Sequence, residues 1–425
     1  MQHHLTLEAR LKAGALDETL TCLYGSAASA RTRCGQVLAG FAKTFGYSPE
    51  ALFSAPGRTE LGGNHTDHQH GCVLAASVDL DLLAAAAPNQ SGMLRIQSQG
   101  HPLVVVDLRE LVPLPGEENT SAALVRGVAA RMAYMGCPLQ GAGLDTYVVS
   151  NVPMGSGLSS SAAFEVLMGT MLNSLFWEEQ CTPLDIARIG QYAENVFFGK
   201  PCGLMDQTAS AVGGVVSIDF ADTAAPTVER IGLELTANGH ALCIMDSSAG
   251  HADLTDEYAA ITGELRAVCR CFGREFLREV PEEAFLAALP QVRKAAGDRA
   301  VLRALHFYAE NRRAVEEANA LKARDFPRFL ELVRQSGRSS ALYLQNVVPT
   351  GQTANQELLV TIALCEHILA GRGAVRVHGG GFGGTAQAFV PLDLLAEFQA
   401  RTEAVLGKGS CHTMRIRPLG GVRLA

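Results

Sequence analysis

Residues 54–67 (SAPGRTELGGNHTD) place an arginine, three glycines and several polar side chains close together. Sugars are recognised by hydrogen bonds: a carboxylate such as Asp67 can accept from two neighbouring hydroxyls, while Asn64 and His65 can both donate and accept. Glycines let the backbone approach a ligand closely. The composition therefore suits a small polyol-binding loop, although a polar turn before the apolar run 72–78 explains it equally well.

A second glycine-rich run, 153–163 (PMGSGLSSSAA), lies between a predicted strand that ends near Ser150 and a predicted helix that extends towards Phe176. Successive backbone N–H groups at a helix N-terminus form an anion site suited to the phosphates of a nucleotide. The three serines alone would indicate a helix cap, but Gly155 and Gly157 before them favour phosphate binding. The Gly-Lys-Ser/Thr ending of a P-loop is absent from this run.

The third run, 194–207, offers two well-separated carboxylates, Glu194 at the end of a predicted helix and Asp206 in a glycine-broken loop. Phosphoryl transfer to a hydroxyl needs Mg²⁺ on the phosphates and a group that accepts or orients the hydroxyl proton, and two carboxylates can divide these tasks. A solvated helix face explains Glu194 equally well. A fourth run, 378–384 (HGGGFGG), is a glycine loop that a tight turn between strands also explains.

Alternating helices and strands must position these runs. Apolar residues at three- and four-residue spacing predict helices over 5–48, 122–135, 252–342 and 358–370. A further helix opens at Thr182-Pro-Leu-Asp185 with a cap and a proline in its first turn, and ends at Gly199. Strand patterns occur within 73–106 and over 145–150, 374–378 and 385–390.

The interleaving of strands and helices in both halves predicts an α+β molecule of two domains. The domains are expected over 1–220 and 238–425, joined by the polar segment 221–237. A length of 425 residues agrees with two domains, since a domain usually takes about 100–200 residues.

The bulk composition describes a well-packed enzyme-like protein that binds neither nucleic acid nor membrane. The net charge of −8 argues against a nucleic-acid binder, which needs a basic face. There is no signal-peptide pattern at the N-terminus and no run of about 18 apolar residues, so a cytoplasmic protein is expected. The eleven cysteines are odd in number and irregularly spaced, which indicates reduced thiols.

Taken in order, the four motifs resemble those of the galactokinases, within the wider family of galactokinase, homoserine kinase, mevalonate kinase and phosphomevalonate kinase. The matching stretches are Ala-Pro-Gly-Arg at 55–58 with His-Thr-Asp at 65–67, Gly-Leu-Ser-Ser-Ser-Ala at 157–162, Cys-Gly-Leu-Met-Asp-Gln at 202–207 and the glycine loop at 379–384. They span nearly the whole chain, and four in order are far more specific than any one of them.

The resemblance implies an N-terminal domain like domain 2 of ribosomal protein S5 and a ferredoxin-like C-terminal domain, with the active site between them. The implied reaction is ATP-dependent phosphorylation of the anomeric hydroxyl of D-galactose to galactose 1-phosphate, with Mg²⁺ as cofactor. The ligands would be ATP and galactose or a close relative, and the protein a monomer or weak homo-oligomer.

The resemblance also assigns roles to residues. Asp206 matches the catalytic base, and Arg58 the cation that keeps it ionised and offsets charge on the phosphoryl group. Ser161 and Glu194 match the magnesium ligands. The expected ATP contacts are Gly155, Ser156, Gly157, Leu158, Ser159, Ser160, Ser161 and, by spacing alone, Ser98. The expected sugar contacts are Asn64, His65, Thr66, Asp67, Gly203 and Tyr258.

The sugar loop departs from the family pattern at one position. Galactokinases usually have Gly-Glu-His-Thr-Asp-Tyr, whereas residues 63–68 here read Gly-Asn-His-Thr-Asp-His. An ionised glutamate can only accept from a sugar hydroxyl, while Asn64 can also donate. Galactose remains the expected substrate, and the loss of negative charge makes galacturonate, arabinose or N-acetylgalactosamine alternatives.

Two further interpretations compete with a galactokinase. A galactokinase-like sensor would bind sugar and nucleotide without catalysis, but such relatives lack part of the small-residue stretch that is present here as Ser-Ala-Ala at 161–163. Another small-molecule kinase of the wider family is disfavoured by the sugar-type loop at 65–67 and by Gly-Leu-Met-Asp-Gln at 203–207.

Overall fold

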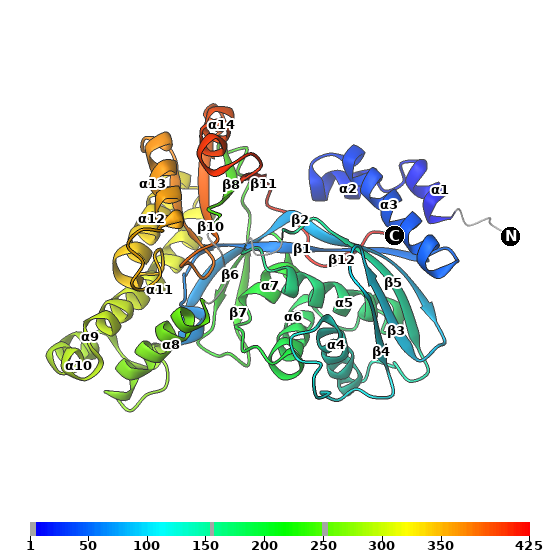
Figure 1. The fold of residues 1–425 in the computed structure, drawn as a ribbon, viewed down its shortest axis with the longest axis horizontal. Helices are drawn as coiled ribbons and strands as arrows, with labels where there is room; N and C mark the ends of the chain where they lie inside the picture. Colours follow the sequence, from blue (N-terminus) through cyan, green and yellow to red (C-terminus); the bar gives the residue numbers. More distant parts are fainter. Residues whose placement is uncertain (1–5, 154–156, 249–253) are drawn as a thin grey trace.

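The computed structural model describes residues 6–153, 157–248 and 254–425, and its largest element is a mixed sheet in the N-terminal half (Figure 1). The strands run in the order β12-β1-β2-β5-β3-β4, while β6 pairs with β2, and β7 with β6. Among the strands that the structure describes, β3 and β5 are the one parallel pair. The strand bounds are β1 (Ala51–Gly62), β2 (Cys72–Asn89), β3 (Met93–Ser98), β4 (Leu103–Asp107), β5 (Gly143–Ser150), β6 (Val215–Asp219), β7 (Thr227–Ile231) and β12 (Val422–Arg423).

Helices cover both faces of this sheet (Figure 1). One face packs against α1 (Leu7–Lys12), α2 (Asp17–Tyr24) and α3 (Ala27–Phe45) through residues such as Leu83 and Ala85 of β2. Because side chains alternate along a strand, Ala84 and Ala86 point to the other face. That face packs against α4 (Ser121–Met135), α5 (Ser160–Phe176) and α7 (Met205–Val212), and α6 (Pro183–Tyr192) packs on these helices.

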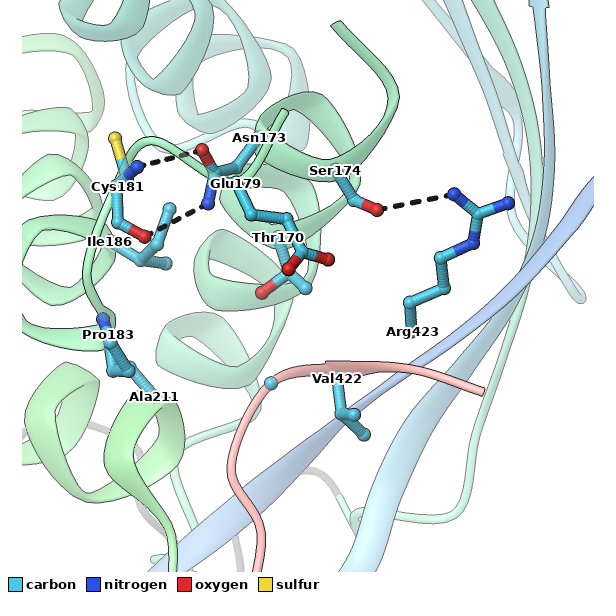
Figure 2. A pocket seen from close by; sticks show the side chains of 11 residues that line it. Thr170, Asn173, Ser174, Glu179, Cys181, Pro183, Ile186, Ala211, Val422 and Arg423 are labelled. Atoms are coloured by element: carbon cyan, nitrogen blue, oxygen red, sulfur yellow. Dashed lines mark hydrogen bonds between the residues drawn. The ribbon is translucent and has the colours of Figure 1, made fainter. Parts of the chain in front are cut away.

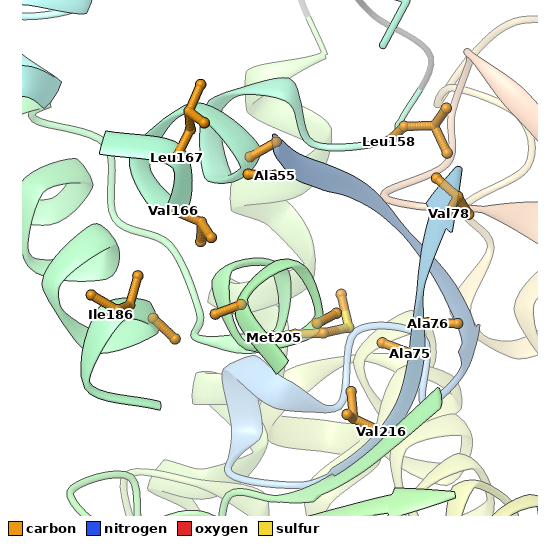
Figure 3. Close-up of a cluster of buried hydrophobic side chains, with 14 of the residues drawn as sticks. Ala55, Ala75, Ala76, Val78, Leu158, Val166, Leu167, Ile186, Met205 and Val216 are labelled. Carbon is orange, nitrogen blue, oxygen red and sulfur yellow. The ribbon is translucent and has the colours of Figure 1, made fainter. Parts of the chain in front are cut away.

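The core on the second face is built mainly from small and branched side chains. Val166 and Leu167 of α5 and Met205 of α7 form one buried cluster with Ala55 and Ala75 of the sheet (Figure 3). Alanine-rich strands let the helices approach closely, so α5 and α7 bring their N-terminal residues next to β1. This packing determines where the second and third motifs meet the first.

The C-terminal half has the ferredoxin-like arrangement that the family resemblance implies. Its antiparallel sheet runs β11-β8-β10-β9, from β8 (His240–Asp246), β9 (Ala374–His378), β10 (Thr385–Pro391) and β11 (Cys411–Met414). Helices separate β8 from β9, and α14 (Leu395–Leu406) separates β10 from β11, which gives the β-α-β-β-α-β order. The other helices are α8 (Thr255–Arg270), α9 (Glu282–Ala287), α10 (Leu289–Ala296), α11 (Asp298–Lys322), α12 (Phe326–Ser339) and α13 (Glu357–Leu369).

Segments at both ends of the expected second domain belong to the sheet of the N-terminal half. The segment 221–237, which the sequence suggested as a linker, contributes β7 to the first sheet. After β11 the chain returns to the N-terminal half, where β12 pairs with β1 and the buried Arg417 contacts Asp81 and Ser54. The division into 1–220 and 238–425 therefore stays an approximate prediction. Among the described residues, no helix is long and apolar enough to span a membrane.

Candidate active site

Arg58 of β1 and Asp206 in the first turn of α7 form a two-pronged ion pair. Arg58 Nε lies 2.6 Å from Asp206 Oδ1, and Arg58 Nη2 lies 2.8 Å from Oδ2. The arginine side chain is 8% exposed and the aspartate side chain 31%, so the carboxylate remains open to a ligand. Such bidentate pairs fix the orientation of both groups, and the third motif thereby meets the first across 148 positions of sequence.

The second motif closes around the same pair. The Arg58 guanidinium donates to the Gly157 carbonyl, and the backbone N–H of Arg58 donates to Leu158 O at 3.0 Å. The Ser159 hydroxyl donates to Asp206. A glycine is needed at position 57 because a Cβ there would lie 2.9 Å from Leu158 O. The strand and the glycine loop therefore pack backbone against backbone.

This environment keeps Asp206 ionised. Burial raises the pKa of the Asp206 carboxyl, but the Arg58 charge and the hydrogen bonds from Arg58 and Ser159 lower it by more, so the net pKa lies below its ordinary value. A carboxylate that is ionised at neutral pH, partly exposed and fixed by an arginine can accept a proton from a bound hydroxyl or orient it.

Within the phosphate loop, residues 155–161, the structure describes residues 157–161, which lead into the N-terminus of α5. Leu158 is buried, while Ser159, Ser160 and Ser161 are partly exposed at the helix start, where backbone N–H groups favour an anion. Gly155 and Ser156 lie outside the described residues. Ser98 ends β3 beside β5, the strand that leads into the loop, so its expected nucleotide contact stays a prediction.

Glu194 and Glu165 are two buried carboxylates that share the amide of Gln207. Glu194 lies in η2 (Ala193–Phe198), is 3% exposed and accepts from Gln207 Nε2 at 2.9 Å. The same amide donates to Glu165 of α5 at 3.0 Å. Burial, and then the charge of Glu194, raise the pKa of Glu165 well above its usual value. Lys200 Nζ lies 3.4 Å from Glu194 Oε1.

Carboxylate and hydroxyl oxygens at Glu194 and Ser161 are hard donors that fit Mg²⁺. The described residues hold no group of three or more His, Cys, Asp or Glu side chains arranged for a metal. Mg²⁺ commonly takes one or two carboxylates and completes its shell with substrate phosphates and water. The donor set at these two residues thus agrees with a metal bound together with a nucleotide.

Asp67 of the sugar loop lies beside the third motif, and His65 lies beside the glycine loop. His65 has φ 59° and contacts Gly380 O through Nε2 at 2.9 Å. Burial lowers the pKa of His65 to about 4, so the ring is neutral at neutral pH. The Asp67 side chain is 12% exposed, and its Oδ1 accepts from the His68 backbone at 3.0 Å. Both side chains keep hydrogen-bonding capacity for a polar ligand.

The glycine loop at 379–381 supports the sugar loop through three consecutive carbonyls. Gly379 O accepts from Asn64 Nδ2 at 2.9 Å, Gly380 O contacts His65, and Gly381 O accepts from the Tyr258 hydroxyl at 3.1 Å. The Tyr258 ring stacks 6.4 Å from that of His65. The fourth motif therefore holds sugar-loop side chains and is more than a turn between strands.

Asn64 and Thr66 face the interior, which corrects the expectation that their side chains contact the sugar. Asn64 is fully buried, donates to Glu60 and Gly379, and accepts from Asn346 at 2.8 Å and Ser340 at 3.2 Å. The buried Thr66 hydroxyl is within hydrogen-bond distance of two backbone carbonyls. Neither side chain keeps a free group for a ligand.

Gly203 gives the third motif its closest approach to the sugar loop. A Cβ at this position would lie 2.4 Å from Asp67 Oδ2. We expect Gly203→Ala to displace Asp67 and raise the sugar KM about tenfold, with a smaller change in kcat, since overpacking of this kind costs about 1–3 kcal/mol. Gly263→Ala on α8, which meets open space, is the control. Steady-state kinetics with equal KM values for both variants would contradict this role.

A separate pocket of about 300 Å³ lies between α5, α6 and β12 (Figure 2). Thr170, Asn173 and Arg423 are among its lining residues, and Asn173 bonds both backbone groups of Cys181. Thr170 follows Ser161 by nine residues, or about 14 Å along the helix. None of the predicted site residues lines this pocket.

Two family models match parts of the chain, and solved structures share its fold. Residues 123–214 match the family model of the GHMP kinases N terminal domain, and residues 39–88 match the galactokinase galactose-binding signature. The structure is similar to Lactococcus lactis galactokinase complexed with galactose, at 25% identity and TM-score 0.78, over 92% of this chain and 99% of that one.

More distant structures share the fold. L. major mevalonate kinase in complex with R-mevalonate matches at 14% identity and TM-score 0.59, over 87% of this chain and 97% of that one. Streptococcus pneumoniae phosphomevalonate kinase in complex with phosphomevalonate and AMPPNP matches at 13% identity and TM-score 0.58, over 88% and 100%.

The fold and the match of residues 123–214 support a small-molecule kinase of the GHMP kinase family. The galactose-binding signature and the whole-chain structural similarity support the galactokinase branch of that family, as the sequence motifs indicated.

Proposed function

We propose that this protein transfers the terminal phosphoryl group of ATP to the anomeric hydroxyl of D-galactose. The arrangement of Asp206 supports this most directly: the ionised carboxylate lies between the phosphate loop, through Ser159, and the sugar loop, through Gly203 and Asp67. A hydroxyl held by the sugar loop can thus meet both a proton acceptor and a phosphoryl donor. Galactose is favoured over galacturonate, arabinose and N-acetylgalactosamine by the galactose-binding signature.

In the proposed mechanism Asp206 accepts or orients the proton of the attacking hydroxyl, and Arg58 offsets charge that develops on the transferred group. His65 and Asp67 hold the ring, with Tyr258 packed against His65. The helix start at Ser159 to Ser161 receives the phosphates. When bound at Ser161 and Glu194, Mg²⁺ would neutralise phosphate charge.

Purified protein with ATP, Mg²⁺ and each candidate sugar tests the function through coupled ADP release, with ³¹P NMR to identify the product. We expect galactose 1-phosphate and the highest kcat/KM with galactose. Turnover of galacturonate or arabinose without turnover of galactose would assign another sugar. ATP and galactose binding without ADP release would favour the sensor.

The proposed magnesium site gives a second prediction. Glu194→Gln removes a charged oxygen donor, so we expect the Mg²⁺ concentration for half-maximal activity to rise about tenfold or more. Titration of Mg²⁺ against ADP binding by calorimetry measures the same effect without turnover. The control is Glu117→Gln, which alters a glutamate paired with Arg126 outside the site. Equal Mg²⁺ dependence in both variants would remove Glu194 from the proposal.

We also propose, from the sequence, that the protein acts in the cytoplasm as a monomer or weak homo-oligomer. Its partners in this proposal are ATP and galactose, without nucleic acid or membrane.

A further inference from the structure

The carboxylate that galactokinases usually carry at position 64 has a counterpart four residues earlier in this chain. Asn64 replaces it, and the Asn64 amide donates to Glu60 Oε1 at 3.0 Å. The same oxygen accepts from Arg376 of β9, which is fully buried. One oxygen of Glu60 is thus held by two donors from opposite halves of the molecule.

The other oxygen, Glu60 Oε2, accepts no hydrogen bond from any residue that the structure describes, although the whole side chain is only 5% exposed. Several other polar atoms without a partner are fully enclosed, but Glu60 Oε2 is not one of them. This oxygen therefore reaches the surface. A carboxylate oxygen that is almost buried and left without a donor favours a ligand that supplies one.

Glu60 lies on the same side of β1 as Arg58. Regular pairing with β2 from Arg58 to Glu60 places these two side chains on the same face of the strand. Burial raises the pKa of Glu60, the charges of Arg376 and Arg58 lower it and that of Asp67 raises it, so the net pKa lies above its ordinary value. Two residues of a strand advance about 6.6 Å, so Glu60 lies further along β1 from the Arg58–Asp206 pair, towards the sugar loop.

We infer that Glu60 is a sugar-binding and specificity-determining residue, whose Oε2 accepts a hydrogen bond from a hydroxyl at the end of the sugar ring remote from the anomeric carbon. The inference rests on the proposed function, which places the anomeric hydroxyl at Asp206. An ionised carboxylate at that end of a sugar has no hydrogen to donate to Glu60 Oε2, so this contact also disfavours uronic acids despite Asn64.

Glu60→Gln tests this inference with galactose, its 3-, 4- and 6-deoxy forms, and galacturonate. Calorimetry gives the Kd of each sugar, and ADP release gives KM and kcat. Hydrogen bonds to charged groups contribute about 1.5–3 kcal/mol, so we expect the galactose Kd and KM to rise about tenfold or more with little change in kcat. The deoxy sugar that lacks the hydroxyl bound by Glu60 should bind the wild-type protein and Glu60→Gln equally. Galacturonate should bind Glu60→Gln more tightly than the wild-type protein.

Glu317→Gln is the matched control, because Glu317 is a buried carboxylate near Arg376 that packs against Gly62, and both its oxygens lack partners. Burial raises the pKa of Glu317 well above its usual value, so the change to an amide alters little charge. For Glu317→Gln we expect the same ratios of Kd and KM between the sugars as in the wild-type protein. Since Glu60→Gln leaves the Arg376 charge buried without its partner, the double variant with Arg376→Met should repeat the sugar pattern if the single variant folds poorly.

An unchanged galactose Kd in Glu60→Gln, or equal weakening for galactose and all three deoxy sugars, would overturn the inference. Failure of the proposed function has a different signature: the wild-type protein would release no ADP with galactose. Calorimetric binding of galactose and its deoxy forms would still report on Glu60 in that case.

Discussion

Replacing Asp206 by asparagine is expected to lower kcat for galactose about 10³-fold while leaving the Kd for ATP within about twofold. Asparagine preserves the size of the side chain but cannot take up the hydroxyl proton, and general bases contribute about 10²–10⁴-fold to rate. The loss should fall on kcat and kcat/KM together, because the interaction is strongest in the transition state. Single-turnover kinetics and nucleotide calorimetry measure the two quantities separately.

Asp219→Asn provides the matched control for this substitution. Asp219 on β6 is also a partly exposed carboxylate, 38% exposed, and it pairs with Arg278 at 3.0 Å. It has no contact with the phosphate or sugar loops among the described residues, so its variant should keep nearly full activity. Near-normal turnover by Asp206→Asn would refute the role of Asp206 as base.

Replacing Arg58 by alanine is expected to lower kcat/KM about 10³-fold and to move the acid limb of its pH profile to higher pH. The arginine offsets charge in the transition state, for which a single cation contributes about 10²–10³-fold. Burial of Asp206 persists in the variant without the guanidinium that opposes it, so the pKa of Asp206 rises. The kcat/KM profile from pH 4 to 9 measures the shift.

The same substitution affects stability in a definite direction. The pKa of Asp206 is lower in the folded protein than in the unfolded chain, so its ionised form stabilises the fold at neutral pH. This contribution is lost as pH falls through the folded-state pKa, and Arg58→Ala removes the main cause of the low pKa. Arg58→Lys keeps the charge and loses the two-pronged geometry, so its acid limb should shift less. An identical acid limb in wild type and Arg58→Ala would contradict the coupling.

The sequence predicted elements best where local signals agreed. Thr182 and Asp185 form the expected capping box, and the helix they open ends at Gly199 as predicted. Its last turn is a π-helix, and spacing alone cannot show this change of hydrogen bonding. Residues 54–67 were expected to form a polar loop, but residues 54–62 belong to the twelve-residue strand β1. Polar side chains in β1 are buried because the C-terminal half covers them, which is information from tertiary contacts.

The structure brings Arg58 and Asp206 together as an ion pair, and the sequence had assigned both to the reaction through ordered motifs without giving any distance between them. Asn64 shows the opposite case. Its residue type suits a sugar, but its partners Ser340 and Asn346 lie more than 270 positions away and no local pattern reveals them. Glu60 and Glu165 were overlooked for the same reason. A glutamate within a largely apolar helix was the available signal for Glu165, whereas Glu60 stands among other polar residues of β1.

The carbonyls of Gly379, Gly380 and Gly381 tie the proposed sugar-binding residues to both halves of the chain. The N-terminal half alone carries Arg58, Asp206 and the phosphate loop, while the acceptors for Asn64 and His65 come from the C-terminal half. We therefore expect that substrate preference cannot be transferred between kinases with the sugar loop alone. An exchange of that loop between two kinases would have to carry the glycine loop with it, whereas the phosphoryl-transfer machinery could stay in place.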